Sequence, residues 1–340
     1  MSRITLKITP LDTFFFGTEN VNPTDKDMKS NYYLKSSILP QQTTILGAAR
    51  FALLLHSDAS IFDNNHIKSK VEAKKLIGEK SFNLNDTVFR FGKIGALSAV
   101  FMLNKDIPYL PCPSFTKEAN LQMIGGNPFL SDYDFKSSRL KQFTNGNEII
   151  NETQIFKEQT QISNRKDSLD KEDAFFKTQF YKLEKDWGFG IQIELGDGNL
   201  LPDRFYMKMG GENKLFCFEK VNCTLDEVAI LKIFSNSSYP AIIAISDMLI
   251  PDYQLMDKCL FSIYQTKPFR YLQSDMDKTK HYTNRSKENH SGMIDSNLID
   301  NIASGAIFYF TNEENRNDFI SDISKYSYLQ KTGFNQLISI

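Results

Sequence analysis

Short runs of apolar residues, several of them alternating with polar residues, predict a chain built mainly from β-strands. Residues 3–10 and 189–195 place apolar side chains at every second position, the period of a half-buried strand. Residues 215–221, 241–245 and 305–310 are shorter apolar runs bounded by glycine, proline or polar residues, and we interpret them as strands too. Residues 88–103, which are rich in Val, Phe, Leu and Ala around two glycines, predict a pair of strands with a turn.

A helical period marks residues 39–55 instead. Ile45, Leu46, Ala49 and Leu53 recur at helical spacing after Pro40, so we predict a helix that ends near His56 and is capped by Thr43 or Thr44. Shorter helices are predicted at residues 71–78, 200–209 and 311–326. Three prolines argue against a central strand at residues 108–113, and residues 116–158 are interpreted as a polar surface insertion.

Charge and aromatic residues set residues 159–186 apart. Arg165 and Lys166 lie among acidic residues, and aromatic residues follow at 175–181, which predicts a hairpin or loop that leads into a strand. The order strand, helix, strand pair, helix, strand is the βαββαβ plan of ferredoxin-like and RNA-recognition domains. We therefore predict an α+β fold of two ferredoxin-like (RRM-like, βαββαβ) domains, at residues 1–222, with long insertions, and 223–340.

Composition restricts the kind of nucleic-acid site that the chain can offer. Lysine and arginine total 40 and aspartate and glutamate 41, so no general basic field is expected and any such site is a local patch or uses backbone amides. The four cysteines form no Cys-x-x-Cys pair, which argues against zinc and favours a reducing, cytoplasmic location. No signal peptide or membrane-spanning run is recognised.

The start of the long helix and a glycine loop are the two candidate anion sites. Free N–H groups at a helix start favour phosphate, Gly47 allows close approach to the first turns, and Arg50 adds charge. Gly210 and Gly211 offer further amides, with Lys214 beside them. The competing interpretations are a core helix whose arginine reaches water and an ordinary tight turn.

Four stretches together resemble the CRISPR-associated RAMP superfamily, and within it the family of third subunits of the type III-B Cmr effector complex. They are the aromatic segment 10–17, the helix start 43–50, the glycine loop 209–214 and the strand 303–310. The order and spacing of these stretches extend the resemblance over the whole chain. Residues 41–42, 159–176 and 269–273 depart from the family pattern.

The resemblance implies a non-catalytic scaffold that holds the 5′ repeat-derived tag of the CRISPR RNA. It implies contacts with the large polymerase-like subunit and the backbone RAMP subunits, indirect contact with target RNA, and a protruding β-hairpin from the insertions before residue 189. No cofactor, metal or membrane is expected. The residues expected at the RNA are Tyr33, Lys35, Gln41, Thr43, Thr44, Gly47, Arg50, Arg165, Lys166, Gly210, Gly211, Asn213 and Lys214.

Two other functions remain open at this point. RAMP relatives that process CRISPR RNA often use a histidine, so a metal-independent endoribonuclease is the alternative. The histidines His56, His66, His281 and His290 have no evident partner at fixed spacing, and we interpret them as ordinary surface or loop residues. The third hypothesis is a structural interaction protein that makes no contact with RNA.

Overall fold

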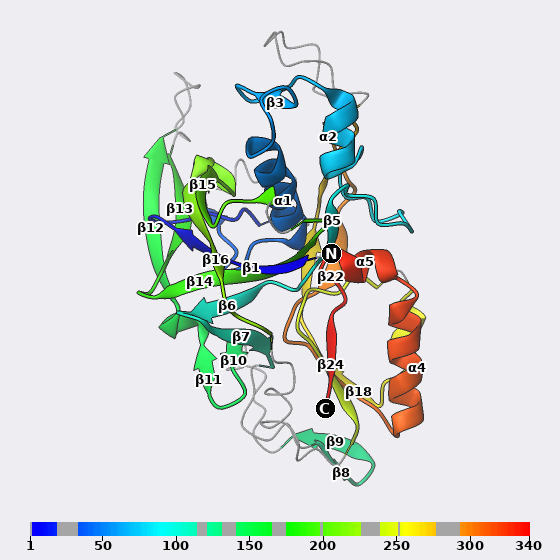
Figure 1. Cartoon of the computed structure of the whole chain (residues 1–340). Coiled ribbons are helices and arrows are strands. Elements are labelled where there is room, and N and C mark those ends of the chain that lie inside the picture. The colour runs from blue at the N-terminus through cyan, green and yellow to red at the C-terminus, as the bar shows by residue number, and fades with distance from the viewer. Residues whose placement is uncertain are drawn as a thin grey trace.

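The computed structural model describes residues 2–18, 33–113, 121–130, 141–164, 175–197, 200–225, 239–250, 252–276 and 293–340. Strands dominate the fold and a few helices pack against them (Figure 1). The mixed α and β content agrees with the α+β class that the sequence predicts. The predicted boundary at residues 222–223 lies at the end of one strand and just before residues outside the described ranges.

The largest sheet carries most of the core of the N-terminal half. Its nine strands are β1 (Ser2–Pro10), β5 (Ile94–Leu97), β6 (Phe101–Asn104), β7 (Ile107–Cys112), β10 (Gln142–Thr144), β11 (Ile149–Asn151), β14 (Trp187–Leu195), β15 (Arg204–Lys208) and β16 (Leu215–Val221). The order is β11-β10-β7-β6-β14-β1-β16-β15, and β5 also pairs with β14. β1 lies between β14 and β16 and is antiparallel to both. The alternating strands at residues 3–10 and 189–195 are confirmed.

Helix α1 (Gln42–Leu55) joins the same hydrophobic core. Its buried side chains include Ile45, Leu46 and Leu53, which cluster with Leu6 and Ile8 of β1. α2 (Lys70–Ile77) follows and ends at Gly78, whose φ of 78° is a conformation that glycine adopts without a steric penalty. Both helices lie where the apolar spacing and the glycine stop predict them.

A second sheet is built on a long hairpin. It contains β12 (Phe156–Asn164), β13 (Phe175–Leu183) and the short β2 (Tyr33–Lys35), in the order β12-β13-β2. β12 and β13 are antiparallel over nine residue pairs, and β2 runs parallel to β13. Figure 1 shows this hairpin as a tall pair of strands at one side of the molecule. The hairpin predicted within residues 159–186 is confirmed in its described part.

The C-terminal part has its own four-stranded sheet. Its strands are β17 (Ala241–Ala244), β18 (Phe261–Ile263), β23 (Ile307–Tyr309) and β24 (Leu337–Ser339), in the order β18-β23-β17-β24. α4 (Glu313–Ser324) packs Phe319 and Ile323 onto Phe308 and Phe310, and α5 (Ser327–Lys331) leads to β24. The helix predicted at residues 311–326 is confirmed by α4. The helix starts after Asn312, whose side chain accepts the N–H of Asn315.

Small elements complete the described chain. Two-stranded sheets pair β3 (Phe62–Asp63) with β4 (His66–Ile67), β8 (Leu121–Ile124) with β9 (Asn127–Leu130), β19 (Thr266–Phe269) with β22 (Ile299–Ile302), and β20 (Leu272–Ser274) with β21 (Met293–Asp295). Short 3-10 helices cover Glu152–Gln154, Gly211–Asn213 and Tyr253–Lys258. The predicted insertion at residues 116–158 therefore contains regular structure where it is described, because β8, β9, β10 and β11 lie in it.

The predicted helix at residues 200–209 is wrong. The chain forms strand β15 there, with Phe205 and Met207 buried and Arg204, Tyr206 and Lys208 exposed. This period-2 pattern covers only five residues, and the preceding leucines and Pro202 mimic the first turn of a helix. Pairing of the whole length of β15 with residues 215–219 of β16 decides the outcome. The second helix of the expected βαββαβ order is thus replaced by an edge strand.

The exclusion of a central strand at residues 108–113 is also wrong. β7 contains Pro108 and Pro111 and lies between β6 and β10. Its first half, with Pro108, pairs with β6, whereas its second half, with Pro111, pairs with β10. Because the strand changes neighbours halfway, each proline needs a partner on one side only. The missing N–H groups therefore break no continuous ladder.

Candidate nucleic-acid interface

The glycine loop packs against the aromatic segment that follows β1. Gly210 has a φ of 74°, and a Cβ on it would lie 2.6 Å from the carbonyl oxygen of Phe15. Gly211 donates its N–H to the same oxygen at 2.9 Å, and a Cβ there would lie 2.7 Å from the Phe15 ring. These two glycines therefore let Phe15 pack directly against the loop. The Gly211 N–H is already used within the chain.

The end of this loop is held by a lysine. The Nζ of Lys214 donates to the Oγ1 of Thr13 at 3.3 Å and lies 5.0 Å from the centre of the Phe180 ring. Asn213 is exposed and has a φ of 51°. Lys214 thus ties the loop to β13, while Asn213 offers its amide to solvent.

The predicted threonine cap of α1 is wrong. Gln41 occupies the N-cap position without a side-chain cap bond, and Thr43 and Thr44 lie half-buried in the first turn. Gln42, the first residue of the helix, is 6% exposed and donates its Nε2 to the carbonyl of Ser98 at 2.7 Å. No acidic residue occupies the first turn, so the helix start keeps its positive partial charge.

Gly47 differs from the other candidate glycines. It is exposed, and a Cβ added to it would meet nothing within 4 Å. A glycine inside a helix costs about 1 kcal/mol relative to alanine, and no packing within the described chain requires it. Thr43 and Thr44 precede it by four and three residues, so all three lie on one face of α1.

Arg50 has partners inside the protein. Its Nε donates to the carbonyl of Ile77 at 2.9 Å, a second guanidinium nitrogen lies 3.4 Å from the carbonyl of Gly78, and the Phe91 ring lies beneath it at 5.6 Å. Burial lowers the pKa of Arg50 to about 10. The side chain thus caps the C-terminal end of α2, a role that neither sequence interpretation included.

Three of the predicted segments meet on the aromatic segment. The carbonyl of Phe15 accepts the N–H of Gly211. Phe16 donates its N–H to the Oγ of Ser36 and accepts the N–H of Ser37. The N–H of Phe14 donates to the Tyr181 carbonyl on β13 at 2.7 Å. Tyr33 and Lys35 belong to β2, directly before these serines. The glycine loop, the chain before α1 and the hairpin therefore share one neighbour. The first turn of α1 instead binds Ser98, through the side chain of Gln42.

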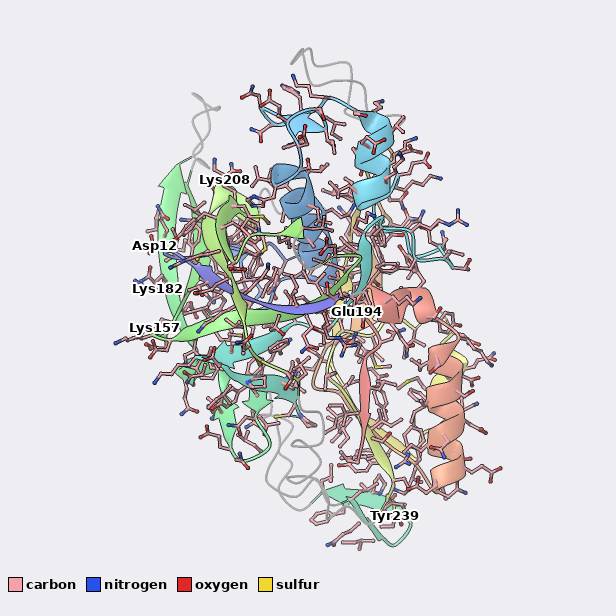
Figure 2. All side chains as sticks on the ribbon, viewed as in Figure 1. Asp12, Lys157, Lys182, Glu194, Lys208 and Tyr239 are labelled. Carbon is pink, nitrogen blue, oxygen red and sulfur yellow. The ribbon has the colours of Figure 1, made fainter. Side chains whose placement is uncertain are left out.

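Sequence reasoning missed several lysines near this region. Lys157 and Lys182 are direct cross-strand partners on β12 and β13, and Lys208 ends β15 at the glycine loop. All three are exposed, and Figure 2 shows them along the same side of the molecule, with Asp12 between them. Lys157 also pairs with Glu184 at 2.6 Å. The alternation of these strands could have predicted that the lysines are exposed. Their position side by side follows only from the pairing of β12 with β13. Arg165 and Lys166 lie outside the described residues.

The described histidines show no catalytic arrangement. The His56 ring packs edge-on against Phe205 with centroids 4.9 Å apart, and burial lowers its pKa. His66 is exposed on β4, and His281 and His290 lie outside the described residues. Within the described ranges, no group of three or more His, Cys, Asp or Glu residues is placed to hold a metal ion. None of the described helices has the length and apolar character needed to cross a membrane.

Comparisons with solved structures extend the fold over the whole chain. A chain of the cryo-EM structure of the type III-B Cmr-beta bound to cognate target RNA aligns over 99% of this chain and 96% of its own length, with a TM-score of 0.51 and 14% identity. A chain of the same complex bound to cognate target RNA and AMPPnP aligns over 98% and 96%, with a TM-score of 0.51 and 14% identity. No curated protein matches the sequence.

The family comparison covers nearly all of the sequence. The family described as "CRISPR-associated protein (Cas_Cmr3)" matches residues 6–125 and 129–340, which include α1, the glycine loop and all four C-terminal sheet strands. The four short stretches that carry the resemblance in the sequence all overlap these matched ranges. The chain belongs to the Cas_Cmr3 family of CRISPR-associated proteins.

Proposed function

We propose that this chain is a non-catalytic subunit of a type III-B CRISPR effector complex and holds the 5′ tag of the CRISPR RNA. Family membership and the fold shared with chains of the Cmr-beta complex support the subunit assignment. In the proposal the chain also bridges the large polymerase-like subunit to the backbone RAMP subunits. Those partners, and the indirect contact with target RNA, follow from the resemblance of the sequence to this family.

The strand order of the N-terminal half supports a ferredoxin-like interpretation. The antiparallel order β6-β14-β1-β16, with α1 following β1 along the chain, corresponds to the expected core once the missing second helix is set aside. The C-terminal sheet of β17, β18, β23 and β24 with α4 is proposed as the second, reduced copy. Both units then offer loops and helix starts to a strand of RNA.

Gly47 is the observation that carries the proposed RNA contact. It leaves an open surface on the first turns of α1, beside Thr43 and Thr44 and close to the uncapped N-terminus. A phosphate backbone fits this place because amide donors and the helix dipole attract it and no side chain at position 47 blocks it. The lysines of β12, β13 and β15 extend the favourable charge along one side.

The experiment uses the assembled complex with a labelled CRISPR RNA. Replacing Gly47 by glutamine adds a side chain where the free protein has open space, so the fold is retained. We expect tag binding to fall at least tenfold, measured by protection of the labelled tag from nuclease. Asn317→Gln, at an exposed position of α4, is the matched control. Unchanged protection in the Gly47 variant would refute this RNA contact.

The non-catalytic part of the proposal has its own test. Purified chain is incubated with repeat RNA in EDTA, with His56→Ala alongside. We expect intact RNA in both samples. Cleavage that disappears with His56→Ala would replace the scaffold by the endoribonuclease of the same superfamily.

A further inference from the structure

The hairpin β8–β9 is an apolar arm with little attachment to the rest of the described chain. Leu121 is fully buried and Leu130 partly buried in the core cluster that joins the two halves of the protein. Beyond these two residues the hairpin is exposed up to its tip. A two-stranded sheet of four residues a side is marginal alone in water, so an arm of this kind gains stability from a partner.

Both faces of the arm carry exposed apolar side chains, and on one of them these side chains lie beside Gln122 and Asn127. Met123 and Pro128 are paired and share the face that carries Leu121 and Leu130, whereas Ile124 and Phe129 lie on the opposite face. Ile124 is 57% exposed, Phe129 46% and Met123 37%. Antiparallel strands usually place polar residues on a solvated face. An occupant that covers this arm therefore has to enclose both sides of it.

The charge of the arm selects the occupant. Residues 121–130 contain no lysine, arginine, aspartate or glutamate. A surface without lysine or arginine lacks the ionic attraction to phosphates that supplies most of the affinity of proteins for nucleic acid. The hairpin β12–β13, by contrast, carries Lys157, Lys177 and Lys182. Figure 1 shows the two hairpins at different ends of the molecule, with β8 and β9 beyond the C-terminal strands.

The turn at the tip is well suited to insertion. Gly125 and Gly126 have φ values of 59° and 82°, which correspond to the two-residue turn that matches the twist of a hairpin. A Cβ at either glycine would meet nothing within 4 Å, so the tip is slender and unobstructed. Its geometry is fixed by the turn rather than by contacts with the rest of the chain.

From these observations we propose that β8–β9 inserts into an apolar slot of another protein subunit, with Ile124 and Phe129 as its anchors. This inference rests on the proposed function, because it takes the neighbouring subunits of the effector complex as the source of the slot. An uncharged two-faced arm matches a protein groove lined by apolar side chains. Contact with RNA or with a second copy of this chain is a different outcome.

A photo-crosslinker placed in the arm tests the proposal. p-Benzoylphenylalanine replaces Phe129 in the full chain, the complete effector complex with CRISPR RNA is assembled, and crosslinked peptides or nucleotides are identified after irradiation. We expect a peptide from another subunit. Crosslinks to RNA, to a second copy of this chain, or to nothing would overturn the inference. If even the unmodified chain stays out of the complex, the proposed function fails first.

A second variant measures the contribution of the anchors. We expect the double variant Ile124→Ser and Phe129→Ser to lower incorporation of the chain into the complex at least tenfold, while its thermal unfolding stays unchanged. Ile107→Ser on β7 is the control, because Ile107 is 51% exposed and also lies on a strand. Equal incorporation of the double variant and this control would contradict the proposed insertion of the arm into another subunit.

Discussion

Gly211 donates its backbone N–H to the carbonyl oxygen of Phe15, 2.9 Å away and almost two hundred residues earlier in the chain. This bond joins the glycine loop to the segment that also contacts β13 and the chain before α1. The loop is therefore part of the framework that positions the proposed RNA surface. Large substitutions in it will disturb this framework and the RNA together.

Gly210→Ala is expected to destabilise the protein. The new Cβ would lie 2.6 Å from the Phe15 carbonyl oxygen, and alanine is strained at a φ of 74°. We expect the free energy of unfolding to fall by about 1–3 kcal/mol, measured by urea denaturation of the free chain. A variant as stable as the parent would show that the loop does not pack on Phe15.

Gly47→Ala is expected to have the opposite sign. The position is helical, exposed and open, so alanine lowers the entropy lost on folding without a clash. We expect the free energy of unfolding to rise by about 0.5–1 kcal/mol, measured in parallel with the Gly210 variant. A loss of stability would mean that a neighbour fills the space beside α1.

Arg50→Met separates a structural from an RNA-contacting arginine. Methionine keeps much of the apolar stem but cannot bind the carbonyls of Ile77 and Gly78. We expect a loss of about 2–3 kcal/mol in unfolding free energy, because two buried acceptors at the end of α2 lose a charged donor. Weaker tag binding with unchanged stability would instead assign Arg50 to the RNA.

Lys141 makes stability depend on pH. Burial, followed by repulsion from Lys267, lowers the pKa of Lys141 to about 8, and Asp247 and Glu152 oppose the shift. Because the folded pKa lies below the unfolded value of 10.5, the unfolded chain binds more protons between these values. Stability therefore rises with pH through this window, by about 1–3 kcal/mol.

The control for this pH effect is Lys141→Met, which removes the titrating group. We expect the parent to gain stability from pH 8 to pH 10 in urea denaturation and the variant to show a flatter profile. The Nζ of Lys141 lies 3.5 Å from the Oγ of Ser304, and Asp247 binds Lys267 at 2.5 Å, so the network links the residue before β10 to the C-terminal part. Parallel profiles for the two proteins would remove Lys141 as the cause.

The lysines on one side of the molecule predict a salt effect. Lys182→Gln with Lys208→Gln removes two exposed charges without touching the buried core. We expect weaker RNA binding by the assembled complex and a shallower dependence of log affinity on log salt, by about 0.7 for each phosphate that a lysine no longer neutralises. The measurement is a titration with labelled CRISPR RNA at several salt concentrations. An unchanged slope would place the RNA elsewhere.

Local pattern was sufficient where a segment buries one regular face. The alternation at residues 189–195, the helical spacing from Ile45 to Leu53 and the glycine after α2 each specify their element through contacts within a few residues. The resemblance of four short stretches also led from the sequence to the family that the whole-chain match confirms. The α+β class followed from the same patterns.

Tertiary structure decided what depends on distant partners. Residues 204–208 form a strand because β16 pairs with them, and β7 accepts two prolines because its two halves have different neighbours. The partners of Arg50 lie 27 and 28 residues away along the chain. The partner of Gly211 is Phe15, near the N-terminus. A sequence alone specifies which polar groups need hydrogen-bond partners and which apolar side chains favour burial. Only the folded chain decides which groups meet, because those contacts join residues that local periodicity cannot relate.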